Sequence, residues 1–531
     1  MFWSLIIVGL ITFIVYLILI KPINYWKSRG IPQPNFLKLW TENARTIFQL
    51  ASQADIVKSV YDSNQGKRYA GGYQFLRLSL ILKDPDLIKQ ITVKDFDHFL
   101  DHSQLISEEI EPLFGKNLFA LQGDTWKDMR ATLSPSFTSS KMRAMFGLMI
   151  ECAEQFVHYF QNGNTETVVE FKDAFTRFAN DVIASTAFGI TCDSLKDREN
   201  EFYIMGKEAT NFGGFWKNFK FLFIFTCPSL SKLFGITMLD TSVGEFFRRL
   251  VKTNIESREK NGIVRPDMIH LLMEARKGRL KHEQSEGVID TGFAVIEESN
   301  VGKEEKRQKK QLSDDDVTAQ ALIFFFAGFD TVSTLMCFAV YELAVNPDVQ
   351  QNLREEIDET LKNCNGSLTY EALLKMKYMD MVISETLRKW PAAIAVDRVC
   401  TKPYTIEPIR NGEKPVHLEK GDVLMLPIYG LHRDKQFYPD PDRFDPERFS
   451  DENKGSIYPY SYIPFGSGPR SCIGNRFALL ETKTVLFCIL SKFEITVVEK
   501  SPVPLRLARN QLNLLAEGGF WFGLKSRKYS D

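Results

Sequence analysis

Apolar residues recur with helical spacing over most of the chain, and the longest such pattern covers residues 314–345. Ser313 precedes it, with Asp316 three residues further on, which is close to a capping box, and Pro347 follows its end. Shorter helices are expected at 124–134, 376–390 and 477–490, and short strands at 75–82 and 422–427. The pattern predicts one mainly helical body with small β-sheets.

The first apolar run, residues 2–20, carries no charge and approaches the roughly 20 residues that a helix needs to cross a bilayer. A cleaved signal peptide would have a shorter run, a basic segment before it and a small-residue cleavage site after it. Lys21, Lys27 and Arg29 follow the run, so the positive-inside rule places the remaining chain in the cytosol. We therefore predict three parts: a membrane anchor at 1–21, a proline-containing linker at 22–34 and the body at 35–531.

Composition narrows the function classes. With 66 Lys and Arg against 67 Asp and Glu, the net charge is −1, so no global polycation is available and no nucleic-acid partner is expected. The 8 cysteines include no CxxC pair, which argues against a disulfide scaffold and a zinc site and leaves a single special thiolate open. The 42 phenylalanines suit a large core or an apolar pocket. The Phe-rich stretch 212–225 is suited either to the core or to a surface that faces the membrane. The charged stretch 300–311 is expected to be a solvated loop.

The strongest chemical signal is the segment Phe465-Gly-Ser-Gly-Pro-Arg-Ser-Cys-Ile-Gly474. Its glycines and proline predict a tight loop that presents Cys472 just before a helix. Successive backbone N–H groups and the positive helix end are expected to favour the thiolate over the thiol. The loop is therefore suited to bind a metal through one anionic sulfur.

Phe465, Gly468, Arg470, Cys472 and Gly474 match the pattern F-x-x-G-x-R-x-C-x-G, and the chain resembles the cytochrome P-450 superfamily in this haem-binding signature. Five fixed residues at this spacing arise by chance in such a chain with a probability on the order of 10⁻⁴. The resemblance implies the helical prism of that superfamily, with an N-terminal transmembrane helix. It also implies that Cys472 is the axial ligand of a haem iron and that Phe465 contacts the haem.

The long helix contains the motif Ala327-Gly328-Phe329-Asp330-Thr331. Taken alone, Thr331 is expected to bond to the carbonyl of Ala327 and Asp330 to face solvent. The motif is similar to the AGxDT pattern of the superfamily. That similarity implies that Ala327 and Gly328 line the oxygen site and that Asp330 and Thr331 deliver protons.

Three further motifs follow family order. Glu385 and Arg388 lie one helical turn apart, and with Arg448 of Pro446-Glu-Arg-Phe449 they resemble the triad that locks the cysteine loop, a structural role. Trp126 and Arg130 match W-x-x-x-R, whose members contact haem propionates, and Arg470 and Arg398 match further propionate-contacting positions. Of two roles that suit His102, a propionate contact and a plain surface histidine, the second is expected.

The resemblance implies a monooxygenase that inserts one atom of O2 into lipophilic small molecules. The chain looks similar to insect microsomal members that oxidise xenobiotics such as plant toxins or insecticides, and endogenous lipophiles remain open as substrates. Apolar residues of the implied pocket are Phe324, Phe325, Ala392, Ala393, Val396 and Leu515. The implied cofactor is haem b (iron protoporphyrin IX), and the implied place is the cytosolic face of the endoplasmic reticulum membrane.

No Gly-rich nucleotide-binding segment is present, so electrons are expected from a separate NADPH-dependent reductase, with cytochrome b5 as a candidate additional partner. Lys127, Lys435 and Arg443 are candidate docking residues, although each fits an ordinary solvated surface equally well. Two rival functions retain the cysteine loop: a haem-thiolate isomerase or dehydratase, and a non-enzymatic haem sensor. The intact Asp330 and Thr331 pair favours oxygen activation over both.

Overall fold

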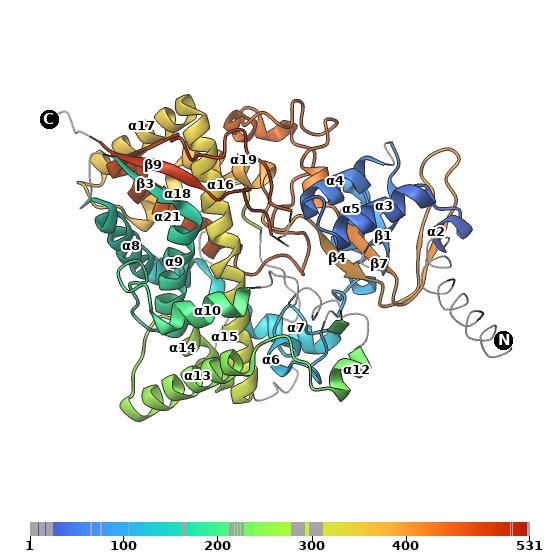
Figure 1. Cartoon of the computed structure of the whole chain (residues 1–531), viewed down its shortest axis with the longest axis horizontal. Coiled ribbons are helices and arrows are strands. Elements are labelled where there is room, and N and C mark those ends of the chain that lie inside the picture. The colour runs from blue at the N-terminus through green and yellow to red at the C-terminus, as the bar shows by residue number, and fades with distance from the viewer. Residues whose placement is uncertain are drawn as a thin grey trace.

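The computed structural model describes residues 25–531 except 64–65, 75–76, 105, 162–165, 212–216, 218–219, 221–222, 225–227, 278–291, 297–311, 510, 512 and 528–531 (Figure 1). Of the first 24 residues it describes only Gly9 and Tyr16. The predicted anchor and the charged stretch 300–311 therefore lie outside the described residues, as does most of the Phe-rich stretch 212–225.

Helices make up most of the described chain. In chain order they are α2 (Tyr25–Ser28), α3 (Phe36–Ile47), α4 (Gln53–Asp62), α5 (Pro85–Lys89), α6 (Pro112–Gly115), α7 (Gly123–Leu133), α8 (Ser139–Gln161), α9 (Phe171–Ile183), α10 (Glu201–Thr210), α12 (Pro228–Leu233), α13 (Thr241–Asn261), α14 (Met268–Arg276), α15 (Asp314–Phe329), α16 (Thr331–Val345), α17 (Pro347–Asn363), α18 (Tyr370–Lys375), α19 (Lys377–Lys389), α20 (Ile428–Leu431) and α21 (Asn475–Lys492). Short 3₁₀ or π turns cover Gln90–Lys94, Phe96–His98, Ser134–Phe137, Ala184–Phe188, Pro446–Phe449 and Lys454–Ser456. The predicted helices at 124–134, 376–390 and 477–490 are confirmed as α7, α19 and α21.

Within the described residues the strands form three small sheets. The first has the order β1-β2-β7-β4, with β2 and β7 parallel and the other pairs antiparallel; the second is β3-β9-β8 and the third β5-β6, both antiparallel. The strands are β1 (Tyr69–Gln74), β2 (Arg77–Leu82), β3 (Glu166–Glu170), β4 (Val396–Val399), β5 (Tyr404–Ile406), β6 (Val416–Leu418), β7 (Val423–Leu426), β8 (Phe493–Thr496) and β9 (Trp521–Ser526). The two predicted strands correspond to β2 and β7, which pair with each other. The prediction of a mainly helical fold with small sheets is confirmed.

The long helix predicted at 314–345 is present as α15 and α16, which meet at Asp330. Its expected start is also confirmed, because Ser313 and Asp316 cap each other reciprocally. By length and apolarity Asp314–Val345 could cross a membrane, but 67% of its most apolar window is buried inside the protein. The helix therefore forms the centre of the core, where α15 packs against α6, α9, α10 and α13, and α16 against α9, α19 and α21.

Most of the buried apolar side chains of the described residues fall into two hydrophobic cores. The larger one surrounds α15 and α16 and draws residues from α8, α9, α13, α19 and α21. The smaller one lies between the four-stranded sheet and its neighbours α2, α4 and α5. Figure 1 shows this division, with α8, α9, α13 and α16 on one side and the four-stranded sheet with α2, α3, α4 and α5 on the side of the N-terminus.

The last part of the predicted linker packs against the body of the protein. Trp26 is buried and lies so close to Gly71 of β1 that a Cβ there would come within 2.5 Å of it. The N–H of Gly71 also donates to the carbonyl of Pro32 at 2.8 Å, and the hydroxyl of Tyr25 donates to Asp422 at 2.7 Å. Residues 25–34 therefore pack along the edge of the four-stranded sheet.

Candidate functional site

The loop that carries Cys472 is closed by its own backbone. The N–H of Cys472 donates to the carbonyl of Phe465 at 2.9 Å, and the N–H of Ser471 donates to that of Gly468 at 2.9 Å. Gly468 has φ +72°, and a Cβ there would lie 1.8 Å from the carbonyl oxygen of Thr92. Only glycine fits this position, because it needs both the left-handed backbone and the close approach.

Cys472 differs from the other described cysteines in its surroundings. Its side chain is exposed, whereas the six others are buried or half-buried. The residue nevertheless lies deep in the protein, and this burial raises the pKa of its thiol, opposed by the N–H of Gly474 and the charge of Arg130. The loop's own N–H group favours the thiolate, as expected, but burial outweighs it. The missing stabilisation of the anion is what a bound metal cation supplies, because coordination deprotonates a thiol outright.

Where α15 meets α16, Thr331 and Ala327 are exposed although most of their helical neighbours are buried. The hydroxyl of Thr331 donates to the carbonyl of Ala327, as expected from sequence. Gly328 allows close packing on α9, since a Cβ there would come within 2.8 Å of Ile183. Thr331 and Ala327 therefore present an open side of the central helix, while Gly328 packs against its neighbour.

Asp330 is held by partners that sequence reasoning missed. Its carboxylate forms an ion pair with the ammonium of Lys172 at 2.8 Å and accepts a hydrogen bond from the amide of Asn513. Lys172, on α9, also donates to the hydroxyls of Ser333 at 2.9 Å and Thr334 at 3.0 Å. The expectation that Asp330 simply faces solvent is corrected. No feature of the sequence around Asp330 predicts this contact, because Lys172 lies 158 residues away from it in the chain.

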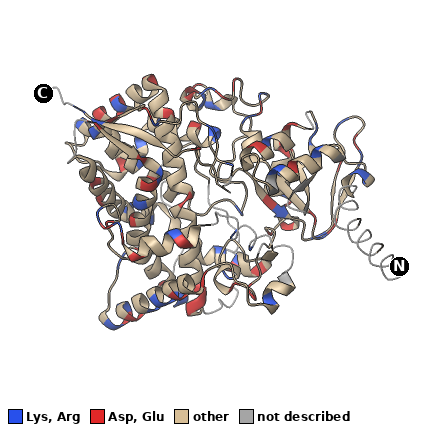
Figure 2. Ribbon diagram, viewed as in Figure 1, with Lys and Arg blue, Asp and Glu red and all other residues tan. Residues whose placement is uncertain are grey.

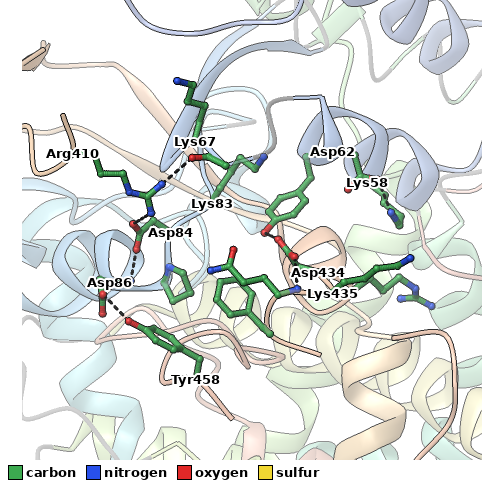
Figure 3. Close-up of a pocket in the computed structure, with 16 residues that line it drawn as sticks. Lys58, Asp62, Lys67, Lys83, Asp84, Asp86, Arg410, Asp434, Lys435 and Tyr458 are labelled. Atoms are coloured by element: carbon green, nitrogen blue, oxygen red, sulfur yellow. Dashed lines mark hydrogen bonds and ion pairs between the residues drawn. The ribbon is translucent and has the colours of Figure 1, made fainter. Parts of the chain in front are cut away.

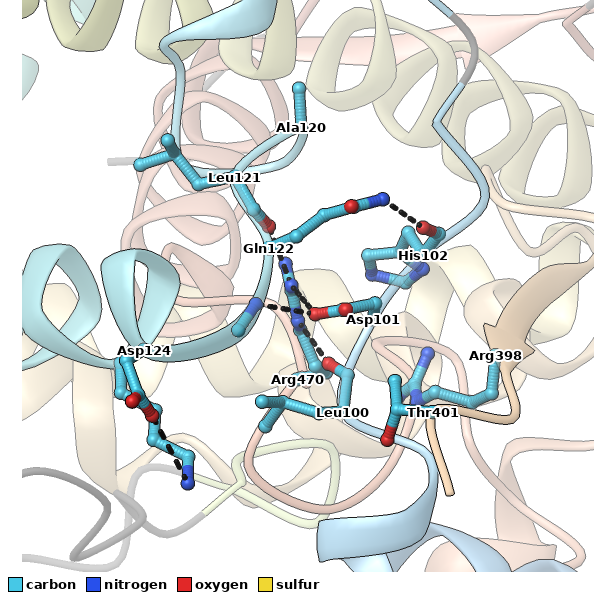
Figure 4. Close-up of polar contacts among 12 residues, drawn as sticks. Leu100, Asp101, His102, Ala120, Leu121, Gln122, Asp124, Arg398, Thr401 and Arg470 are labelled. Carbon is cyan, nitrogen blue, oxygen red and sulfur yellow. Dashed lines mark hydrogen bonds and ion pairs between the residues drawn. The ribbon is translucent and has the colours of Figure 1, made fainter. Parts of the chain in front are cut away.

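Three of the predicted propionate-binding residues are buried near one another: Arg130, Arg398 and Arg470. Figure 4 shows Arg470 among the backbone of residues 100–122, with Arg398 nearby. Arg470 donates to the carbonyls of Leu100 at 2.8 Å and Leu121 at 2.7 Å, and lies 3.4 Å from the carboxylate of Asp101. Its guanidinium lies 4.0 Å from the ring of Trp126, which is itself buried. Arg470 thus joins the cysteine loop to the chain ahead of α7.

The other two arginines contact the cysteine loop through carbonyl groups. Arg130 donates to the carbonyl of Ser471 at 2.8 Å, and Arg398 to that of Ser467 at 3.1 Å. The Nε of Arg398 is buried and has no hydrogen-bond partner among the described residues. A buried guanidinium N–H is costly to leave without an acceptor, so this atom marks a place for one.

The electrostatics of this group are those of an anion site. Burial lowers the pKa of Arg470 to about 9, with Arg398 and Arg130 acting in the same direction against Asp101. Burial also lowers the pKa of Arg398 to about 10, opposed by Asp397. Three buried guanidinium groups therefore face two carboxylates, and a further anion would complete the balance.

His102 corrects another expectation, since it is buried and not a surface residue. Its Nδ1 lies 2.8 Å from the carboxylate of Asp397, and its ring stacks on that of Phe119. Burial lowers the pKa of His102 although Asp397 opposes this, so the ring is neutral at pH 7. A neutral His102 donates its proton to Asp397 and adds no further cation to the arginines.

Glu385 contacts both Arg388 and Arg448, so the three residues form the network that the sequence motifs predict. Glu385 and Arg388 are fully buried and share two hydrogen bonds at 2.7 and 2.9 Å, and Arg448 lies 3.5 Å from Glu385. Burial raises the pKa of Glu385, but these bonds oppose it, and the carboxylate raises the pKa of Arg388 in turn. Arg388 also donates to the carbonyls of His432 at 2.9 Å and Pro441 at 2.7 Å. The network ties α19 to the chain that leads into the cysteine loop.

Most of the predicted pocket residues remain at least partly accessible: Phe324, Ala392, Ala393, Val396 and Leu515. Phe325 is the exception. Its side chain is fully buried, with ring centroids of Phe202 and Phe247 both at 5.4 Å, so it belongs to the core. This corrects its predicted place in the pocket lining.

A cavity of about 540 Å³ lies beside the four-stranded sheet, and none of the site residues described above lines it (Figure 3). Its lining is charged, and several of the charges pair with one another, including Lys58 with Asp62 and Arg410 with Asp84. Figure 2 shows the same interspersion of basic and acidic residues over much of the described chain. By contrast, α15 carries its charges in its first turn, and Glu342 is the charged residue of α16. We assign this cavity no part in the chemistry.

The mainly helical fold and the F-x-x-G-x-R-x-C-x-G loop are together typical of haem-dependent oxygenases. A family model described as Cytochrome P450 matches residues 46–521. Among curated proteins, the chain is 47% identical to "Cytochrome P450 9e2" of Blattella germanica, covering 98% of this chain and 97% of that protein. It is 43% identical to "Probable cytochrome P450 9f2" of Drosophila melanogaster, covering 95% of each. It is 35% identical to "Cytochrome P450 6k1" of Blattella germanica, covering 97% and 95%.

The chain therefore belongs to the cytochrome P450 family, and its resemblance to insect members is confirmed. It is a monooxygenase, and membership of the family implies haem, O2 and electrons from a reductase. The residues present fit such a group. Cys472 offers one accessible sulfur, and the arginine group offers an unpaired buried N–H and an excess of positive charge for carboxylates of a porphyrin.

Proposed function

We propose that this chain is a membrane-anchored haem-thiolate monooxygenase that inserts one oxygen atom from O2 into lipophilic small molecules, xenobiotics such as plant toxins or insecticides being the favoured class. Its electrons would come from an NADPH-dependent reductase, with cytochrome b5 as a candidate additional partner. The apolar run at 2–20 and the named insect relatives support a place on the cytosolic face of the endoplasmic reticulum. The observation that carries the proposal is Cys472, an exposed sulfur in a glycine-tightened loop that lies deep in the protein.

Haem b would be held from two sides by this chain. Cys472 would bind the iron, and Phe465 would contact the haem. Arg130, Arg398 and Trp126 would bind the propionates, with the unpaired Nε of Arg398 as the clearest free donor. Arg470 already has backbone acceptors for its donors, so we propose that it acts mainly by its charge and by fixing the chain ahead of α7. When bound, haem supplies the activation of O2 that no side chain can perform.

Asp330 and Thr331 would supply the proton on the opposite side. Thr331 Oγ1 donates to Ala327 and keeps its lone pairs for a water molecule, so it can orient that water beside Ala327. Asp330 would pass protons from solvent to this water. Lys172 and Asn513 each contact one carboxylate oxygen of Asp330. We propose that they position this carboxylate and that both contacts break when its side chain rotates toward the water.

Glu385, Arg388 and Arg448 would hold the cysteine loop and take no part in the chemistry. The accessible apolar residues Phe324, Ala392, Ala393, Val396 and Leu515 would line the substrate pocket and exclude water from it. Lys127, Lys435 and Arg443 remain proposed contacts for the reductase.

The test is turnover of the purified full chain with added reductase, NADPH and ¹⁸O2, on a set of lipophilic alkyl ethers and alkylarenes. Each productive turnover should consume one NADPH and one O2, place one ¹⁸O atom in the product and release the other as water. Cys472→Ala should abolish this, whereas Cys364→Ala, a matched change at the end of α17, should not. Conversion without NADPH would indicate an isomerase or dehydratase, and haem binding without any product from the whole set would indicate a sensor; either result would overturn the proposal.

A further inference from the structure

A short segment far from the cysteine loop in sequence is docked directly beside it. Residues 292–296 lie in the long connection between α14 and α15 and are described, whereas the residues on both sides of them are not. Ala294 is 4% exposed, and Val295 packs against the main core. We call residues 292–296 the strap, because they cross from α19 to the start of α21.

One end of the strap is fixed at α19. The N–H of Phe293 donates to the carboxylate of Asp380 at 2.9 Å, and the same carboxylate pairs with the buried ammonium of Lys483 on α21 at 2.9 Å. Gly292 has φ +116°, and a Cβ there would lie 1.9 Å from Asp380. No other residue fits at Gly292 without moving this ion pair.

The side chain of Phe293 makes the main apolar contact of the strap. Its ring centroid lies 5.0 Å from that of Phe449 and 5.4 Å from that of Tyr462, both in edge-on or tilted geometry. Phe449 follows Arg448 directly, and the hydroxyl of Tyr462 donates to the carbonyl of Ser384, next to Glu385. The strap therefore packs on the network that leads into the cysteine loop.

The other end of the strap reaches Cys472 through one side chain. The N–H of Ile296 donates to Oδ1 of Asn475 at 3.4 Å, and Nδ2 of Asn475 donates to the carbonyl of Cys472 at 2.9 Å. Only one orientation of the amide makes both bonds, because its oxygen can only accept and its nitrogen can only donate. Asn475 is 6% exposed, so no bulk water replaces a lost partner.

We propose that the strap is a positioning element for the iron-binding cysteine, acting through Asn475 on the backbone carbonyl of Cys472. This rests on the proposed function of Cys472. With the strap docked, Ile296 fixes the orientation of the Asn475 amide, and that amide fixes the peptide that follows Cys472. With the strap displaced, the amide is free to rotate, and the cysteine loses one of the constraints on its orientation toward the metal.

The experiment measures two properties of the full-length holoprotein for Phe293→Ala, Asn475→Ala and the double variant. One is the rate of haem transfer to excess apomyoglobin, and the other is the share of reduced, carbon monoxide-bound protein with the absorption band of a thiolate ligand. Phe234→Ala, which removes a largely exposed ring beyond α12, is the matched control. Phe293→Leu tests rescue by a smaller apolar side chain if Phe293→Ala does not fold.

Each single variant is expected to lose haem about fivefold faster than the control and to retain a smaller share of the thiolate band. Because both changes interrupt one path, the double variant should be no worse than the worse single variant. If Phe293→Ala and Phe293→Leu both match Phe234→Ala, or if the two single effects multiply in the double variant, the proposal is overturned. A wild-type protein without the thiolate band would instead contradict the proposed function itself, so the two failures are distinguishable.

Discussion

Arg388 and Arg398 lie ten residues apart in the sequence, and both are essentially fully buried, yet their surroundings differ. Arg388 donates two hydrogen bonds to the carboxylate of Glu385, and its remaining donors bond to two backbone carbonyls. Arg398 has backbone carbonyls, an orphan Nε and two other buried arginines in its neighbourhood. A buried charge that is matched inside the protein holds the fold together, and one that is not matched indicates a ligand of opposite charge.

The largest effect is expected from breaking the matched group. Arg388→Met leaves Glu385 buried without its main partner, and removing one member of a buried ion pair destabilises a protein by about 3–5 kcal/mol. We expect a collapse in the yield of folded protein and a strongly lowered midpoint of urea unfolding. Arg410→Met, at an exposed pair, is the control. An unfolding midpoint of Arg388→Met equal to that of the control would contradict the structural role of the network.

The second-largest effect is expected from acid, which should lower the stability of the fold through His432, the neighbour of Arg388. Its ring lies against Arg388, with Nε2 accepting from the N–H of Ile463 at 2.9 Å, and burial lowers its pKa to about 3, assisted by the charge of Arg388. Between this value and the ordinary pKa of about 6.5 the unfolded chain binds a proton that the folded chain does not, so stability falls as pH falls. The loss from this residue should reach about 3 kcal/mol at pH 4.

The measurement is the free energy of unfolding of the full chain between pH 7 and pH 4, for the wild type and His432→Gln. The variant lacks the titrating ring, so its curve should be flatter over this range even if its stability at pH 7 is lower. Parallel curves for the two proteins would show that His432 is not the acid-sensitive group.

Glu481 sharpens the comparison because it is buried on α21 with no hydrogen-bond partner for either oxygen among the described residues. Burial raises the pKa of this carboxyl well above its usual value. Such a group stabilises the fold fully below its unfolded pKa, and this contribution is lost as pH rises toward the folded pKa. Glu481→Gln should therefore stabilise the protein at pH 7.5 by at least about 1 kcal/mol more than at pH 4.5, measured by urea unfolding. A gain that is the same at both pH values would contradict the raised pKa of Glu481.

The smallest effect on the fold is expected from the unmatched group. Arg398→Met removes one of three crowded cations, so the haem-free protein should unfold at the same urea concentration as the wild type or a slightly higher one. Haem affinity should fall about tenfold, which corresponds to about 1.4 kcal/mol. Titration of the haem-free protein with haem checks this. Destabilisation as severe as that of Arg388→Met, with haem affinity retained, would remove the distinction between the two arginines.

The sequence predicted those parts of the molecule whose signals are local. The helix from Ser313 to Val345, the loop around Cys472 and the turn that joins Glu385 to Arg388 all follow from spacing within one segment. The packing of Trp26 on Gly71 could not be predicted in this way, because it depends on a strand that local composition does not reveal.

Contacts between distant segments were beyond such reasoning. Lys172 reaches Asp330 across 158 residues, and His102 is buried by its bond to Asp397, which lies 295 residues away. The thiol of Cys472 shows the same limit in its energetics. Its loop was predicted from glycines and a helix start, but the direction of its pKa shift depends on how much protein surrounds it, and that is set by the whole fold.

The measurement that tests the central claim most directly is the absorption spectrum of the reduced, carbon monoxide-bound full-length protein, compared between the wild type and Cys472→Ala. An anionic sulfur on the iron gives the wild type the long-wavelength Soret band of a thiolate ligand, and the variant should lack this band and carry less haem. If Cys472→Ala retains its full haem content and an unchanged spectrum, Cys472 is not the ligand and the account of the site is wrong.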